Sequence, residues 1–247
     1  TIGILINNIF FGKVKLNNSD WKFIYLFGIC QNTLYLGLNF LAMDRIDAYL
    51  AVIIASLLPI FVAIISFSLK KDKIHFLSVI GIIVGFFGCS IILAPKITVN
   101  LNLYGLSLCL IAVIALAMAT LIIKDGFSYK EQLLPFVSIQ MIVGGLPLLL
   151  LSFLFEEWII NFSNSFIIAF IYTCFFPGLI ATMIWFNLVK RIGVIMASSF
   201  HFLTPPTGVI IAYIVLNERI NISDIIGIIF ITIALTTIHQ AKKKTKI

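Results

Sequence analysis

Two stretches of the sequence carry polar side chains at a spacing that places them on one face of a helix. In the first, Asn32, Tyr35 and Asn39 follow each other at positions i, i+3 and i+7, with Gln31 beside them. Amide and phenol groups form hydrogen bonds, so this face is suited to lining a cavity for a polar small molecule. The same groups also join neighbouring helices, and the sequence leaves that alternative open.

The second stretch holds Ser198, His201 and Pro205 at the same spacing. Pro205 removes a backbone donor, which favours a kink and leaves a carbonyl group free. Pro59, together with Ser56, repeats this arrangement in the first half of the chain. We therefore expect two broken helices beside a binding site, and kinks with a purely structural role are the alternative.

His201 is the only Asp, Glu, Lys, Arg or His residue that lies well inside an apolar run. Imidazole changes its charge near neutral pH, which makes His201 the candidate for proton coupling. Carriers coupled to protons or sodium usually keep a carboxylate in the membrane, and this sequence has none there. We therefore predict a neutral His201 and transport down the substrate gradient. Gln140 and Trp185 are further candidates for the cavity wall.

Motifs for catalysis or metal binding are absent from the sequence. It contains no H-E-x-x-H, no G-x-S-x-G and no pair of carboxylates within an apolar run. Each of the four cysteines lies inside an apolar run without forming a C-x-x-C pair, so we interpret them as packing residues. We expect no enzyme activity, no cofactor and no metal.

The elements that position these residues follow from the composition. Of the 247 residues, 61% are hydrophobic and 11% are charged, against roughly 25% charged in an ordinary soluble domain. Too few polar residues remain to cover a surface in water, which excludes a soluble enzyme and predicts an all-α polytopic membrane protein. The basic residues stand in short clusters between apolar runs, so the net charge of +7 does not indicate a nucleic-acid partner.

Eight apolar runs have the length of about 20 residues that a helix needs to cross a bilayer. They cover 23–43, 46–69, 74–94, 101–123, 132–155, 165–189, 192–216 and 222–240. A shorter run, 1–12, lacks the basic residues of a signal peptide, and we interpret it as the end of a helix that begins before Thr1. We expect Gly144 and Gly145 to allow close contact between helices.

The basic residues predict the orientation in the membrane. With successive loops on alternate sides, all but three of the 17 Lys and Arg residues fall on one side. The exceptions are Arg45, Lys96 and Arg219. Lys and Arg are enriched in cytoplasmic loops, so we predict a multi-pass protein of the cell (inner) membrane with a cytoplasmic C-terminus.

The sequence repeats itself at an offset of 146 residues. The matching pairs are Arg45/Arg191, Ala51/Ala197, Pro59/Pro205, Asp72/Glu218 and Gly81/Gly227. The offset covers five helices, an odd number, so equivalent helices would cross the membrane in opposite directions. Inverted repeats of this kind are typical of secondary transporters with a substrate site near the midplane between the halves. We divide the chain into a truncated first repeat, 1–95, and a second repeat, 96–247.

Three strings in the second half carry a family resemblance. They run from Ile139 to Pro147, from Arg191 to Pro205, and from Leu216 to Arg219 before the Gly227 helix. With them the chain resembles the EamA-type branch of the drug/metabolite transporter superfamily. The resemblance implies an inverted repeat of five-helix units, ten helices in the intact protein, and a peripheral position for helices five and ten. Asp72 stands where the family has Glu, and the first helix is absent.

We therefore expect a secondary transporter that moves small metabolites by alternating access about a midplane site. The resemblance implies export of amino acids or related compounds. Uptake or exchange of nucleoside or sugar derivatives, an open channel and a non-transporting scaffold are the alternatives. Expected partners are a small-molecule substrate and the lipid bilayer, and a homodimer is left open. The candidate binding residues are Asn32, Tyr35, Asn39, Ser56, Pro59, Gln140, Trp185, Ser198, His201 and Pro205.

Overall fold

The computed structural model describes residues 3–4, 18–69, 74–96, 102–125, 133–157, 162–217 and 219–245. The described part of the chain is almost entirely helical and contains no strand. Eight of its helical segments are long and apolar enough to cross a membrane, and they coincide with the eight predicted runs. The predicted all-α membrane fold is therefore confirmed. The basic loop 70–73, Glu218 and all but residues 3–4 of the run 1–12 lie outside the described residues.

The spans are built from the following elements. The first span consists of α2 (Asn18–Gly28), the π-helix η1 (Ile29–Leu36) and α3 (Gly37–Met43). The second consists of α4 (Ala48–Ala55) and α5 (Leu58–Ser68). The third is α6 (Phe76–Leu93), followed by the 3₁₀ helix η2 (Ala94–Lys96). The next two are α7 (Leu103–Asp125) and α8 (Leu133–Phe155). The sixth span consists of α9 (Asn164–Thr173), the π-helix η3 (Cys174–Ile180) and α10 (Ala181–Ile192). The seventh consists of α11 (Val194–Ser199), the 3₁₀ helix η4 (Phe200–Leu203) and α12 (Thr204–Leu216). The eighth is α13 (Ile222–Thr245).

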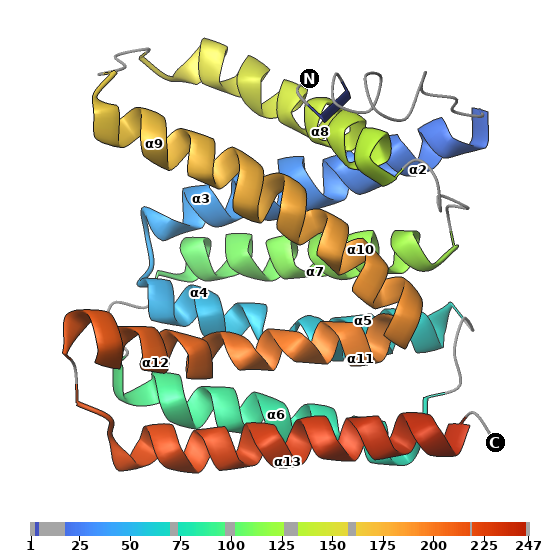
Figure 1. Ribbon diagram of the computed structural model, residues 1–247, viewed down its shortest axis with the longest axis vertical. Helices are drawn as coiled ribbons and strands as arrows, with labels where there is room; N and C mark the ends of the chain where they lie inside the picture. The colour runs from blue at the N-terminus through green and yellow to red at the C-terminus, as the bar shows by residue number, and fades with distance from the viewer. Residues whose placement is uncertain are drawn as a thin grey trace.

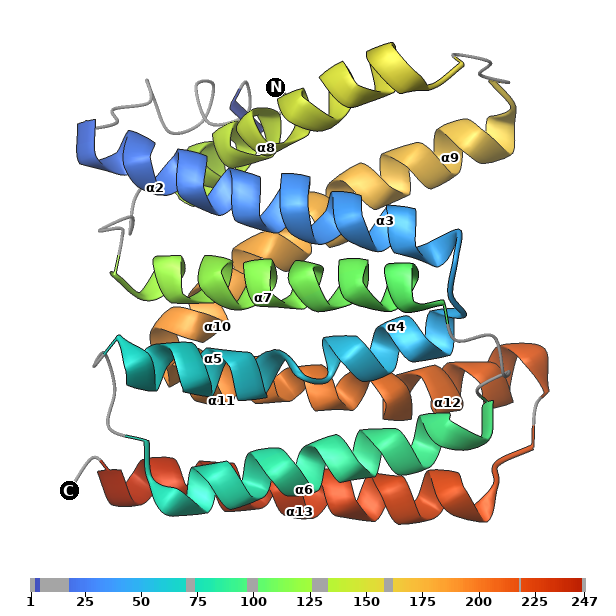
Figure 2. The same ribbon diagram turned by 180° about the vertical axis from the view of Figure 1, so that it is seen from behind.

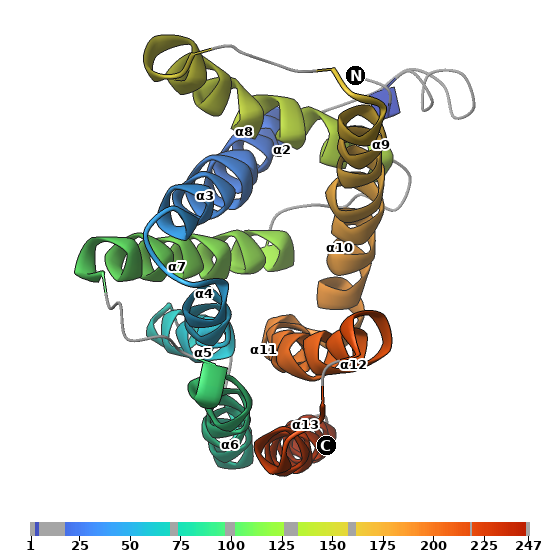
Figure 3. The same cartoon turned by 90° about the vertical axis from the view of Figure 1, so that its left-hand side faces the viewer.

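The helices lie side by side in a stack, as both broad faces of the molecule show (Figures 1 and 2). Seen along the helix axes, they form two columns. One column contains α2–α3, α7, α4–α5 and α6, and the other contains α9–α10, α11–α12 and α13 (Figure 3). At one end of the stack α6 packs along α13, where a Cβ on Gly227 would lie 2.6 Å from the carbonyl oxygen of Gly88. At that end, this contact joins the two columns to each other.

Corresponding elements of the two halves begin at a constant distance along the chain. The starting pairs are Asn18/Asn164, Ala48/Val194, Leu58/Thr204 and Phe76/Ile222, each 146 residues apart. The irregular segments match as well: among the described residues, each half has one π-helix and one broken span. Pro59 and Pro205 stand in the first turn after the breaks, where a missing N–H costs no helical hydrogen bond.

Aromatic rings hold α10 against α2 and α8. Phe186 of α10 contacts Phe27 of α2 and Phe136 of α8, with ring centroids 4.7 Å and 5.4 Å apart in edge-to-face geometry. All three side chains are buried. The other end of the same span differs, because α9 has no buried residue. The sixth span is therefore anchored through α10.

The two adjacent glycines of α8 differ in their surroundings. A Cβ on Gly144 would meet the carbonyl oxygen of Gly28, so the prediction of close helix contact is confirmed there. At Gly145 no atom lies within 4 Å of the ideal Cβ position, and the prediction is wrong for this residue. Successive residues of a helix face different directions, and only Gly144 points at α2 and η1.

Candidate functional site

Two cavities are lined by residues of both columns. The larger has a volume of about 440 Å³ and the smaller about 340 Å³. They share the lining residues Tyr35, Leu36, Phe40 and His201, and we call them together the central cavity. Their size falls within the range of about 300–1,000 Å³ that is usual for small-molecule sites.

The polar face of η1 and α3 lies on the central cavity. Asn32, Tyr35 and Asn39 all belong to its lining. Asn32 Nδ2 also donates to Gln140 Oε1 of α8 at 2.7 Å and to the Gln140 carbonyl oxygen at 3.3 Å. Asn39 Nδ2 donates to the Tyr35 carbonyl oxygen at 2.8 Å within its own span. Asn32 thus combines the two roles that the sequence left open, cavity lining and interhelical bonding.

An aromatic pair lies on the second half's side of the cavity. The rings of Trp185 in α10 and His201 in η4 have centroids 5.2 Å apart and an interplanar angle of 86°, which is a favourable edge-to-face arrangement. His201 lines both cavities from the broken span. Across from it, Ser56 lines the smaller cavity at the other break, and its hydroxyl donates to the Ile53 carbonyl oxygen at 2.6 Å.

Four of the predicted residues are not part of the cavity lining. Pro59 and Pro205 are buried in the first turns of α5 and α12. Ser198 is fully buried, and its hydroxyl donates to the Ile195 carbonyl oxygen at 3.0 Å. Gln140 is also fully buried and contacts the cavity only through Asn32. These buried residues therefore lie behind the residues that line the cavity and support their positions.

The π-helix η3 and the start of α10 form a wall that sequence reasoning missed. Pro177, Gly178, Ala181 and Thr182 line the larger cavity. Gly178 and Ala181 carry no signal of their own in a membrane span. Pro177 and Thr182 belong to no set of three polar residues at helical spacing, which would have singled them out. The internal repeat, however, identifies them, since Gln31 shifted by 146 residues falls on Pro177 and the other three follow in the same way.

The chemistry of the lining is that of neutral hydrogen-bonding and aromatic groups. Among the described residues that line the central cavity, none is Asp, Glu, Lys or Arg. The described residues also contain no group of three or more His, Cys, Asp or Glu side chains that could hold a metal ion. The arrangement is suited to binding a small molecule by hydrogen bonds and ring contacts.

Known proteins are similar to this chain in sequence and in fold. The chain matches the EamA-like transporter family over residues 1–94 and 103–239. A chloroplastic WAT1-related protein of Arabidopsis thaliana is 25% identical over 229 residues, which cover 89% of this chain and 55% of that protein. The uncharacterized transporter YvbV of Bacillus subtilis is 23% identical over 235 residues, covering 95% of this chain and 76% of YvbV. A crystal structure superposes with a TM-score of 0.80 at 15% identity, covering 97% of this chain and 83% of the other.

Proposed function

The chain belongs to the EamA-like transporter family, and on this premise we propose that the protein is a secondary membrane transporter for small metabolites. Residues 1–95 and 96–247 form an inverted pair of repeats, and the substrate binds in the central cavity between them. Movement of one repeat against the other opens the cavity to each side of the membrane in turn.

The observation that carries this proposal is that equivalent positions of the two halves line one cavity. The pairs, each 146 residues apart, are Gln31/Pro177, Asn32/Gly178, Tyr35/Ala181, Leu36/Thr182, Asn39/Trp185 and Ala55/His201. A shared cavity at the interface of two repeats is the arrangement that alternating access requires. A membrane scaffold has no need of such a cavity.

The broken spans support the proposed movement. The break between α4 and α5 carries Ser56, and the break between α11 and α12 carries His201, so both breaks border the central cavity. At a break some helical hydrogen bonds are already missing, and a span bends there at lower cost than within a continuous helix. Each half thus has one bending point beside the substrate.

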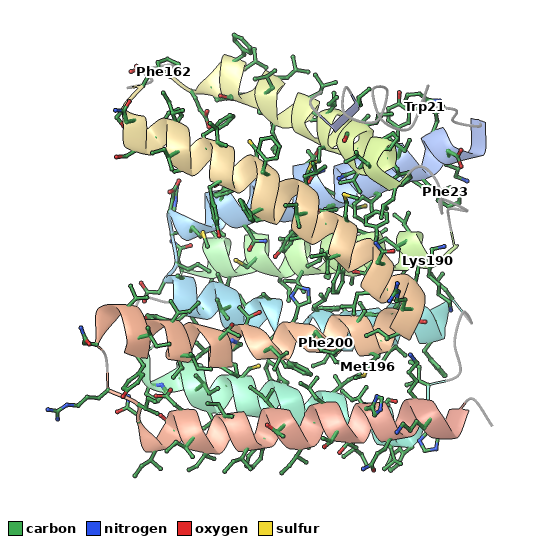
Figure 4. All side chains as sticks on the ribbon, viewed as in Figure 1. Trp21, Phe23, Phe162, Lys190, Met196 and Phe200 are labelled. Atoms are coloured by element: carbon green, nitrogen blue, oxygen red, sulfur yellow. The ribbon has the colours of Figure 1, made fainter. Side chains whose placement is uncertain are left out.

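For the orientation we propose a multi-pass protein of the cell inner membrane with the C-terminus in the cytoplasm. Trp21 and Lys190 lie on the right-hand side of Figure 4, where their helices end, and Phe162 lies on the left-hand side, as the alternating loops require. Trp21 is 38% exposed, in keeping with the aromatic belt at a membrane interface. The excess of basic residues on the Lys190 side supports a cytoplasmic assignment of that side.

For the substrate we propose export of amino acids or related compounds, with nucleosides and sugar derivatives as the second candidate. The second candidate is favoured by the neutral lining, because a charged group that leaves water for a cavity without a charged partner pays a desolvation cost. Both classes fit the volume of the central cavity.

A counterflow screen in proteoliposomes tests the proposal. Liposomes loaded with an unlabelled amino acid, nucleoside or sugar derivative should take up the labelled compound with saturable kinetics, faster than unloaded liposomes. Ala181→Trp fills the cavity and should abolish this exchange. Ala169→Trp on the exposed surface of α9 is the matched control and should preserve it. Flux that does not saturate would indicate a channel, and no exchange of any class would contradict the proposal.

A further inference from the structure

Gln31 has an acceptor atom without a partner beside the proposed substrate site. Its side chain lines the larger cavity, from the π-helix η1. Its carboxamide oxygen Oε1 is buried and accepts no hydrogen bond from the described residues. Buried polar atoms in folded proteins nearly always have a partner, and an exception calls for a specific explanation.

Gln31 and Gln140 each have one buried amide atom without a partner among the described residues, but only Gln31 belongs to the lining of the central cavity. Asn32 donates to Gln140, and Asn39 donates to the Tyr35 carbonyl oxygen, so both side chains are already engaged in the protein. Gln31 Oε1 is not engaged, and the terminal Cγ–Cδ torsion of glutamine rotates broadly. Oε1 is covered in this conformation, and a half-turn about the bond would exchange it with the amide nitrogen Nε2 without moving the backbone. A donor group of the substrate can then form a hydrogen bond to Oε1, and no hydrogen bond within the protein is broken.

The two halves contribute different chemistry to the cavity. Gln31 and Asn32 of the first half correspond to Pro177 and Gly178 of the second half, whose side chains have no hydrogen-bonding group. Elsewhere in the lining the second half contributes Thr182, Trp185 and His201. At the place of Gln31 and Asn32, however, it offers no side-chain acceptor, so a donor group of a bound molecule at this place is directed to η1.

We propose that Gln31 determines substrate specificity by accepting a hydrogen bond from an N–H or O–H group of the transported molecule. This inference rests on the proposed function, because it takes the central cavity as the substrate site. The donor group is a neutral N–H, an O–H or an ammonium N–H. What these groups share is a polar hydrogen that can form a hydrogen bond to Oε1. Compounds of the same shape without that hydrogen bind about tenfold more weakly.

Ligand-induced stabilisation of the purified protein in detergent tests the inference without requiring transport. Two probe pairs are compared: uracil with 1,3-dimethyluracil, and phenethylamine with its N,N,N-trimethyl derivative. Methylation removes every N–H in both pairs and retains a positive charge in the second. At least one parent compound should raise the Tm at about tenfold lower concentration than its methylated partner. The uracil pair reports a neutral donor, and the amine pair reports an ammonium donor.

Three variants separate the role of Gln31 from general effects on folding. Gln31→Met removes the acceptor at nearly constant volume and should abolish the preference for the parent compound. Gln31→Glu retains an acceptor and should preserve the preference. Gln240→Met makes the same change at an exposed position of α13 and should behave as the wild type. Equal shifts within each pair, no shift by any probe, or a preference that survives in Gln31→Met would overturn the inference. A failed counterflow screen alongside intact donor preference would instead count against the transport function.

Discussion

The contact of α8 with η1 predicts that Gly144→Ala destabilises the protein. A new methyl group would meet the carbonyl oxygen of Gly28 and would lie 2.7 Å from Cβ of Asn32, closer than non-bonded carbon atoms approach. The helices must separate, which weakens two interhelical hydrogen bonds. These run from Asn32 Nδ2 to Gln140 Oε1 at 2.7 Å and from Thr33 Oγ1 to the Gly144 carbonyl oxygen at 2.6 Å.

The expected magnitude follows from these two effects. Overpacking of a close contact costs about 1–3 kcal/mol, and each weakened interhelical hydrogen bond in a membrane protein costs about 0.6 kcal/mol. Gly144→Ala should therefore lower the free energy of unfolding by about 2–4 kcal/mol. Gly145→Ala places the same methyl group where no atom lies within 4 Å. It should leave stability unchanged or raise it by up to ~1 kcal/mol through higher helix propensity.

Reversible unfolding in mixed micelles, followed by circular dichroism, measures both variants under identical conditions. Because Gly145 is adjacent to Gly144 in the same helix, Gly145→Ala controls for effects of expression level, detergent and helix propensity on the measured stability. If Gly144→Ala were as stable as the wild type, or if both variants lost the same stability, the close approach of α8 and η1 would be refuted.

Two further predictions concern orientation and coupling. Cysteine labelling of intact cells from outside should reach a Cys placed at Glu157 but not one placed at Lys71, and the reverse pattern would overturn the proposed orientation. His201→Gln should raise the half-saturation concentration about fivefold through a lost contact of about 1 kcal/mol, while downhill flux stays measurable. Accumulation driven by a pH gradient in the native protein, abolished selectively by His201→Gln, would instead make His201 the coupling site.

The fold was predictable because hydropathy alone determines which segments cross a bilayer. Pro59 and Pro205 indicated the two broken spans, since proline inside an apolar run favours a kink or a break of the helix. The π-helices at 29–36 and 174–180 were not foreseen. The second of them contains Pro177, but a proline does not distinguish a π-helix from a kinked α-helix, and the first contains no proline.

Several polar residues of the candidate site were predictable, because polar side chains are costly in a membrane unless they face a cavity or another helix. Asn32 and His201 were identified on that ground, and both line the central cavity. Ser198 shares the helical spacing of His201 but lies behind the wall, because the span changes from α-helical to 3₁₀ winding at Phe200 and the spacing rule assumes a uniform helix. Gln140 carries the same polar signal, and only the tertiary structure shows that Asn32 covers it.

The most direct test of the central claim is whether the cavity is the transport path. Ala181→Cys lines the larger cavity and is combined with Cys174→Ser, which removes the exposed native thiol. Modification of this variant by a charged methanethiosulfonate is followed in proteoliposomes together with counterflow. We predict that modification stops exchange and that the transported compound slows the modification. Complete modification with undiminished exchange would contradict the account.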